Sequence, residues 1–270
     1  ALWKDRIGKD IGYYVSANVA TLRNRLTNIG AANPDGSKPV WTYEDDYHYK
    51  ELTPYRSSEG KPLYSYYLLR TDGVFQTDAE AAAYVNSNGQ RLQPKAKAGD
   101  LKFVDVDQNG SIGEGDYEFR GNAMPKMTYA FSAGFSYKKF SFDFMLQGSY
   151  GAKLFNAYKY TTLNEAVGSF NRSEKILKAL EGPTYDVPRI TMTDDNDNFG
   201  RISDWYLESG SYLRMKNISI SYSFSDLLRK LAFFNQRQST LDLTLSCDNL
   251  FTITPYSGID PEVGGVGLDC

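Results

Sequence analysis

The sequence predicts an all-β fold: an antiparallel transmembrane β-barrel portion of about five spanning strands with long extracellular loops. Apolar and small polar residues alternate strictly in several stretches of about 10 residues, with aromatic residues at the apolar positions. The polar positions hold mostly Ser, Thr, Asn and Gly, whereas the solvent face of a soluble sheet usually carries many Lys and Glu. Long and short connections also alternate along the chain.

The alternation is clearest from Thr128 to Tyr150. It restarts after Lys138 and Lys139, which indicates a β-hairpin with one apolar and one polar face. Further strands are expected at 11–23, 213–224 and 240–254. The residues expected to face lipid are Tyr129, Phe131, Phe135, Phe142, Phe144, Ile218, Ile220, Leu243 and Leu245. Those expected to face the lumen or a plug are Ser132, Ser136, Asp143, Gln147, Ser219, Ser221, Asp242 and Ser246.

The connections at about 28–126 and 151–212 are long, whereas those at 138–139 and 225–239 are short. Outer-membrane barrels place long loops outside the cell and short turns in the periplasm. The strands that begin at 11, 140 and 240 are therefore expected to run outward, and those that begin at 127 and 213 inward. Arg214 and Lys216 share the apolar parity of their strand, at its outer end, where a charge costs little.

The first long connection contains local signals of its own. A turn is expected at 33–36 and an extended segment at 63–75. Thr77 as N-cap with Glu80 three residues later predicts a short helix over 79–85 that stops by Gly89. In the second long connection, the Asp- and Asn-rich run at 194–198 is expected to be a solvated loop.

Aromatic residues are abundant in the outer loops. They could stack on sugar rings or pack against a partner, but packing within their own loops is the more frequent role. The residues in question are Trp41, Tyr43, Tyr47, Tyr49, Tyr64, Tyr66 and Tyr67.

Composition excludes several classes of function. The 270 residues carry 30 Lys and Arg against 33 Asp and Glu, a balance that implies no nucleic-acid partner. No run of 18 apolar residues is present, so no membrane-spanning helix is expected. The single histidine, His48, is interpreted as a loop residue, and no catalytic constellation is visible, so we expect no enzyme. Cys247 and Cys270 give no disulfide framework.

A calcium-binding loop is the best local chemical signal. Asp105, Asp107, Asn109 and Asp116 stand at positions 1, 3, 5 and 12 of such a loop, and Ser111 at position 7 offers its backbone carbonyl. Gly at position 6 permits the turn, and the apolar residue at position 8 anchors it. Asp instead of Glu at position 12 shortens the reach to the ion. A turn of Asp, Asn and Gly that needs no metal remains the alternative.

Four ordered motifs carry a family resemblance. Residues 99–112 read GDLKFVDVDQNGSI and residues 121–126 read GNAMPK. Residues 210–217 read GSYLRMKN, and residues 248–252 read DNLFT, followed by YSGIDPE at 256–262. Together they resemble the signature of the SusC/RagA family.

The resemblance implies a TonB-dependent outer-membrane transporter of Bacteroidota, with a barrel of about 22 strands around an N-terminal plug. It further implies a SusD-like surface lipoprotein as partner, contact with the TonB complex through an N-terminal region, and import of oligosaccharides or peptides across outer-membrane lipid. On this interpretation, residues 1–270 are the C-terminal part of such a barrel, with the plug domain and the final strand absent.

Two alternatives remain at this point. One is a soluble calcium-dependent β-sandwich that binds carbohydrate through its loop aromatics. The other is a barrel wall that only anchors a surface lipoprotein. A barrel wall that only anchors a lipoprotein would differ from a transporter because it would show no uptake driven by the proton-motive force.

Overall fold

The computed structural model describes residues 2–7, 10–47, 50–168, 170–224, 241–262 and 268–269. The chain divides into two units. Unit 1 consists of Ala1–Leu22, Pro125–Ala152 and Gly210–Pro255, and unit 2 consists of Arg23–Met124, Lys153–Ser209 and Tyr256–Cys270. His48, Cys270 and the connection expected at 225–239 lie outside the described residues.

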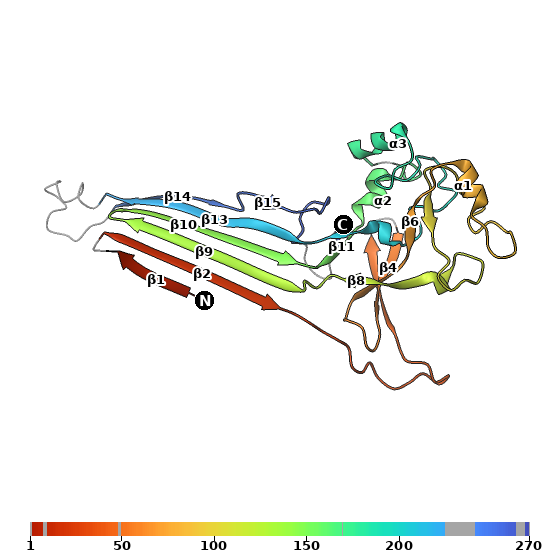
Figure 1. Ribbon diagram of the computed structural model, residues 1–270, viewed down its shortest axis with the longest axis horizontal. Helices are drawn as coiled ribbons and strands as arrows, with labels where there is room; N and C mark the ends of the chain where they lie inside the picture. The colour runs from red at the N-terminus through yellow and green to blue at the C-terminus, as the bar shows by residue number, and fades with distance from the viewer. Residues whose placement is uncertain are drawn as a thin grey trace. The chain divides into compact units, whose positions relative to one another are not determined.

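Unit 1 is one antiparallel sheet in the order β1-β2-β9-β10-β13-β14, with β15 also paired to β13 (Figure 1). Its strands are β1 (Leu2–Ile7), β2 (Ile11–Thr21), β9 (Met127–Tyr137), β10 (Phe140–Tyr150), β13 (Tyr212–Ser223), β14 (Asp242–Asp248) and β15 (Thr252–Ile253). The predicted hairpin is confirmed, with Tyr137 paired to Phe140 across a turn in which Lys138 has φ 54°.

The register gives this sheet two chemically different faces. One row across the strands is Tyr13, Phe135, Phe142, Ile220 and Leu245. The adjacent row, which points to the opposite side, is Tyr14, Gly134, Asp143, Ser219 and Ser246. We call these sides the apolar face and the polar face. The residues expected to face lipid lie on the apolar face, and those expected to face the lumen or a plug lie on the polar face, so the predicted separation of the two sets is confirmed.

A β-bulge corrects the expectation for Arg214. Pairing shifts between Met145 and Leu146, so that Met145 opposes Asn217 while Leu146 opposes Met215 and leaves Lys216 as the extra residue. Beyond the bulge Arg214 pairs with Gln147 and lies on the polar face. Its Nε donates to Oγ1 of Thr252 at 2.8 Å. The expected apolar parity of Arg214 is therefore wrong, because one inserted residue exchanges the two faces.

Two further differences concern strand number and continuity. The edge strand β1 was not expected, because Lys4, Asp5 and Arg6 interrupt its pattern, yet it pairs with β2 from Leu2–Ser16 to Ile7–Ile11. The strand expected at 240–254 is divided into β14 and β15 at Asn249, which has φ 52°.

The described residues of unit 2 form three small sheets and several short helices. The sheets have the orders β3-β4-β5-β8, β12-β11-β16 and β6-β7. The strands are β3 (Trp41–Tyr47), β4 (Lys50–Ser57), β5 (Ser65–Leu69), β6 (Thr71–Val74), β7 (Leu101–Phe103), β8 (Tyr117–Asn122), β11 (Lys153–Asn156), β12 (Leu207–Ser209) and β16 (Leu268–Asp269). The helices are α1 (Asp78–Ala83), η1 (Glu114–Asp116), α2 (Tyr158–Leu163), η2 (Glu174–Leu177), α3 (Lys178–Glu181) and η3 (Asp204–Tyr206).

The predicted capping of α1 is confirmed. Oγ1 of Thr77 accepts from the Glu80 amide at 3.1 Å, and the Glu80 carboxylate accepts from the Gln76 amide at 2.7 Å. The helix ends at Ala83 because Tyr84 begins a tight hairpin, in which its carbonyl accepts from the Leu92 amide at 3.0 Å. None of the helices in the described part of the chain is long and apolar enough to span a membrane.

Aromatic side chains from distant segments form the core of unit 2. Tyr66 of β5 lies 5.1 Å from Tyr55 and 6.4 Å from Phe155 between ring centroids, and Phe155 stacks on Tyr206 at 4.8 Å. All four side chains are buried. The two long connections between the strands of unit 1 therefore share one core, in which burial of each aromatic ring contributes about 2–3 kcal/mol.

Candidate functional site

The predicted calcium-loop residues lie in unit 2 between β7 and β8. Asp105 follows β7, and Asp116 ends η1 immediately before β8. Carboxylate oxygens of Asp105, Asp107 and Asp116 all lie within 4.8 Å of one another. The structure thus brings together three of the predicted ligands.

Side-chain to backbone hydrogen bonds shape the first half of the loop. Oδ2 of Asp105 accepts from the Gly110 amide at 2.9 Å, and Oδ1 of Asp107 accepts from the Asn109 amide at 3.0 Å. Oδ1 of Asn109 accepts from both the amide and the hydroxyl of Ser111, at 2.9 and 2.7 Å. Gly110 has φ 88°, a left-handed conformation that glycine adopts without strain.

Asp116 closes the loop from the inside. Its side chain is fully buried, and its carboxylate accepts from the amides of Val106 at 2.6 Å and Gly113 at 2.7 Å. These bonds fix the carboxylate toward the loop interior. The apolar residue at position 8, Ile112, packs against the core of unit 2, as an anchoring residue should.

The donor set suits a hard cation. Oδ1 of Asp105 is buried and has no hydrogen-bond partner among the described residues. The ion pairs of the described residues include none of the three carboxylates. Oxygen ligands of this kind are those that Ca²⁺ prefers.

A second polar feature is the hollow on the polar face of unit 1. Gly12 and Gly134 carry no side chains there, and the hollow has a volume of about 240 Å³. A Cβ on Gly134 would collide with the Tyr14 ring and the Asp143 carboxylate. Lys4 and Arg6 of β1 complete the lining with cations. This face offers charged and hydroxyl groups to water or to a polar partner.

The apolar face of unit 1 is exposed over several strands. Leu243 is 65% exposed, Leu245 75% and Ile253 63%. The outer end of the Tyr129 ring lies close to Gly148 of the neighbouring strand, and the Tyr129 hydroxyl donates to the Tyr212 carbonyl at 3.1 Å. Apolar side chains exposed over several strands are typical of a surface that contacts lipid or another protein.

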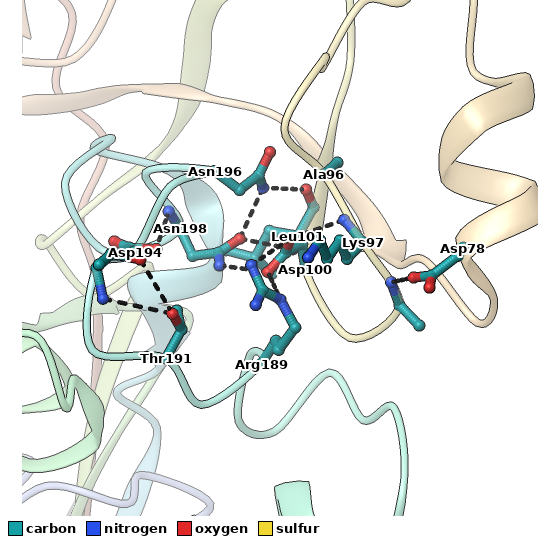
Figure 2. A network of polar contacts seen from close by, with 12 residues as sticks. Asp78, Ala96, Lys97, Asp100, Leu101, Arg189, Thr191, Asp194, Asn196 and Asn198 are labelled. Atoms are coloured by element: carbon teal, nitrogen blue, oxygen red, sulfur yellow. Dashed lines mark hydrogen bonds and ion pairs between the residues drawn. The ribbon is translucent and has the colours of Figure 1, made fainter.

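A buried ion pair links two segments of unit 2 that are far apart in sequence (Figure 2). Asp100, which is fully buried, accepts from Nε and Nη2 of Arg189 at 2.9 and 3.1 Å. Nδ2 of Asn198 donates to the same carboxylate at 2.9 Å, and the Lys97 amide donates at 2.8 Å.

The run at 194–198, expected to be a solvated loop, is solvated only in part: Asp195 and Asp197 are exposed, whereas Asn196 and Asn198 belong to this buried network. Asn198 is fully buried and Asn196 is 6% exposed. The side-chain Oδ1 of Asn198 accepts from the Leu101 amide at 2.8 Å, and Nδ2 of Asn196 donates to the Leu101 backbone carbonyl at 3.2 Å. Burial raises the pKa of Asp194, whose carboxylate caps the amides of Asn198 and Phe199. Asn196 and Asn198 bond Leu101 and Asp100, which lie almost a hundred positions away, so no local signal identified these two residues.

Another ion pair holds the segment that follows β15. Nζ of Lys159 lies 2.9 Å from Oε1 of Glu208 and donates to the Trp205 carbonyl at 2.7 Å. Glu208 also accepts from the amide and the hydroxyl of Ser257, at 2.7 and 2.8 Å. Burial lowers the pKa of Lys159. Burial alone would raise the pKa of Glu208, but Lys159 and Ser257 outweigh it, and the net pKa lies below its usual value.

The loop aromatics whose side chains the structure describes serve mainly in packing. Tyr66 is fully buried, and Tyr64 packs against the core of unit 2. Tyr67 is partly buried. The guanidinium carbon of Arg56 lies 4.3 Å from its ring centroid, and the tilted ring of Phe119 lies 5.1 Å from it. The side chains of Trp41, Tyr43 and Tyr47, and all of Tyr49, lie outside the described residues.

Comparisons with known proteins show what this chain is similar to. No protein-family model matches the chain. TonB-dependent receptor P3 of Formosa agariphila is 28% identical over 258 residues, which cover 94% of this chain and 23% of the receptor. TonB-dependent receptor SusC of Bacteroides thetaiotaomicron is 25% identical over 168 residues, which cover 62% of this chain and 16% of SusC. The chain is SusC/RagA-like.

Solved structures agree on the fold. The RagAB peptide transporter matches with a TM-score of 0.70 and 22% identity, over 99% of this chain and 26% of that one. The RagAB peptide importer in its open-open state matches with a TM-score of 0.67 and 21% identity. The fold of the SusC/RagA-like chain is accordingly a portion of an antiparallel β-barrel, as predicted. The chain spans about a quarter of the length of these relatives.

Proposed function

We propose that this chain supplies spanning strands and outer loops to a TonB-dependent importer of oligosaccharides or peptides in the cell outer membrane. In this proposal a SusD-like surface lipoprotein is its partner outside the cell, and the TonB complex energises it through a region beyond these strands. The support is the similarity to TonB-dependent receptors together with the two-faced sheet of unit 1.

The single observation that carries the proposal is the division of one sheet into an apolar and a polar face. A barrel strand in a membrane places alternate side chains in lipid and in the lumen. Rows of Phe, Ile and Leu on one side, and of Ser and Asp on the other, satisfy both environments. The open edges of β1 and β14 are the places where further strands would pair.

The orientation follows from the connections. The two long connections leave the sheet after β2 and after β10 and contribute most of unit 2. Long loops of outer-membrane barrels lie outside the cell. We therefore assign β2, β10 and β14 as outward-running strands, and unit 2 as the surface offered to the lipoprotein.

The substrate class remains between oligosaccharide and peptide. The structural relatives are described as a peptide importer and a peptide transporter, and SusC is a TonB-dependent receptor. None of the described residues forms a catalytic constellation, and import needs none.

A soluble calcium-dependent carbohydrate-binding β-sandwich is the less favoured function. A sandwich buries the apolar face of one sheet against a second sheet. In unit 1 the described strands form a single sheet, and Leu245 on its apolar face stays 75% exposed.

The test is uptake by cells that carry the full-length gene and its neighbouring lipoprotein gene. Labelled oligosaccharides and labelled peptides are supplied separately, with and without a protonophore. Uptake of one class that stops when the proton-motive force is removed supports import and identifies the substrate. A protein that binds the lipoprotein but imports neither class would instead be a wall that anchors it. Recovery of the full-length protein in the soluble fraction without detergent would contradict the membrane assignment.

A further inference from the structure

We propose that the loop from Asp105 to Asp116 is a structural Ca²⁺ site that fixes two adjoining segments of unit 2. The ligands are carboxylate oxygens of Asp105, Asp107 and Asp116, the side-chain oxygen of Asn109 and the backbone carbonyl of Ser111. This site does not depend on the proposed import function, because its geometry lies entirely within unit 2.

Charge is the first argument. Three carboxylates lie within 4.8 Å of one another, and that of Asp116 is fully buried. Like charges at this separation repel strongly, and a buried carboxylate is costly unless it is compensated. Among the described residues no Lys or Arg forms an ion pair with any of them. A bound divalent cation supplies the missing positive charge.

The second argument is the unpaired oxygen of Asp105. Its Oδ2 accepts from the Gly110 amide, which holds the carboxylate in place, whereas Oδ1 is buried with no donor among the described residues. Buried acceptors without a partner are rare and costly. Asp105 is also one of the three carboxylates that lie within 4.8 Å of one another.

The ligand chemistry selects calcium. All proposed donors are hard oxygens, and no His or Cys takes part, which disfavours Zn²⁺. Mg²⁺ demands a nearly ideal octahedron and keeps several of its waters, whereas Ca²⁺ accepts six to eight oxygens in an irregular loop. The Asp at position 12 is held by two short amide bonds, so it offers its remaining lone pairs to the ion.

The site connects two segments. Nδ2 of Asn86 donates to the Gly110 carbonyl at 3.0 Å, and the Asn86 carboxamide oxygen accepts from the amides of Asn88 and Gln90. The turn at 86–90 is therefore hydrogen-bonded to the loop at 105–116. Loss of the ion is expected to loosen 105–116 and 86–90 together.

Calorimetric titration of the full-length protein in detergent micelles, first stripped with EDTA, tests the proposal with CaCl₂ as the probe. The expected dissociation constant is about 10⁻⁴–10⁻³ M, in the range of extracellular calcium modules. The double variant Asp105→Asn, Asp107→Asn should bind at least ~10-fold more weakly. Asp35→Asn is the matched control, because Asp35 makes the same kind of turn bonds, to Ser37, in an exposed loop without clustered carboxylates. Its affinity should equal that of the wild type.

Hydrogen exchange of the unmodified protein provides a second measurement that needs no variant. Addition of CaCl₂, but not of MgCl₂ at the same concentration, should slow exchange at 105–116 and at 86–90. Equal calcium affinity of the wild type and the double variant would overturn the site. Exchange at 105–116 that is unchanged by calcium in the wild type would overturn it as well.

Discussion

Single side chains on the two faces of unit 1 differ in what a positive charge would cost. Phe144 lies on the apolar face between Ala133 and Ile218, and Ser219 lies on the polar face opposite Asp143. Phe144→Arg should destabilise the inserted protein by about 2–4 kcal/mol if the position is near mid-membrane. Ser219→Arg, the control, should have a much smaller effect. Urea titration of the protein refolded into lipid vesicles measures both, and equal losses would contradict the assignment of the faces.

The buried pair of Asp100 and Arg189 makes a different prediction at the same scale. Arg189→Met leaves Asp100 buried without its cation and should cost about 3–5 kcal/mol of local stability. Adding Asp100→Asn should recover part of this loss, because a neutral carboxamide needs no counter-charge and its one oxygen can still accept from the Lys97 amide. Hydrogen exchange at 96–103 reports the change.

An exposed ion pair serves as the control for the buried pair of Asp100 and Arg189. Lys178 and Asp186 form an ion pair in solvent, and Lys178→Met should produce no measurable change in exchange at 96–103. If the double variant at Asp100 and Arg189 were less stable than Arg189→Met alone, the desolvation argument would be wrong.

At the scale of elements, the strands of unit 1 other than β1 could be predicted because each carries its own signal. Alternation is read within one strand, and the turn at Lys138 is read within two residues, so neither requires a distant partner. The calcium loop is similarly local, since all its predicted ligands fall between Asp105 and Asp116. The convergence of three of its carboxylates could thus be anticipated from spacing alone.

The remaining elements depend on partners that a single sequence does not reveal. Strand β1 is held by pairing with β2 despite three consecutive charged residues. The face of Arg214 depends on a bulge opposite Met145 and Leu146. Asn196 and Asn198 are buried because Leu101 and Asp100 receive their hydrogen bonds. In each case the deciding contact joins distant segments.

The Ser257 contact should depend on pH. The pKa of Glu208 is lowered in the folded protein, so its contribution to stability is present above the usual glutamate value of about 4.3 and is lost as pH falls through the folded-state pKa. Exchange of the Ser257 amide, corrected for its intrinsic pH dependence, should therefore accelerate on acidification below the usual glutamate pKa.

Glu208→Gln should expose this amide already at neutral pH, because buried Lys159 then lacks its counter-charge, at a cost of about 3 kcal/mol. Glu165→Gln, which breaks a pair with Arg172 elsewhere in unit 2, should leave the Ser257 amide unchanged. An acid-induced acceleration that persists in Glu208→Gln would show that another group is responsible.

At the scale of the whole molecule, the sheet should tolerate a cut in its first long connection. Gly36 lies in an exposed turn with φ 82°, and nothing lies within 4 Å of an added Cβ. Strand β2 pairs with β9 at every position from Ile11–Tyr137 to Thr21–Met127. A protease site at 34–36 should thus be cleaved while both fragments stay associated in micelles, as judged by co-purification.

The same site at Lys138 and Lys139 should resist cleavage, because the turn is too tight to enter a protease. Separation of the fragments after the first cut would contradict the pairing.

The shared core of unit 2 limits which segments can be exchanged between related proteins. Asp100 and Arg189 come from different connections, as do Tyr66 and Phe155, and Ser257 comes from a third segment that meets Glu208. A chimaera that exchanges the second connection alone would separate all three pairs, and one that exchanges the first connection alone would separate the first two. In both, the strands of unit 1 would keep their register. The three segments of unit 2 should consequently be exchanged between relatives as one set.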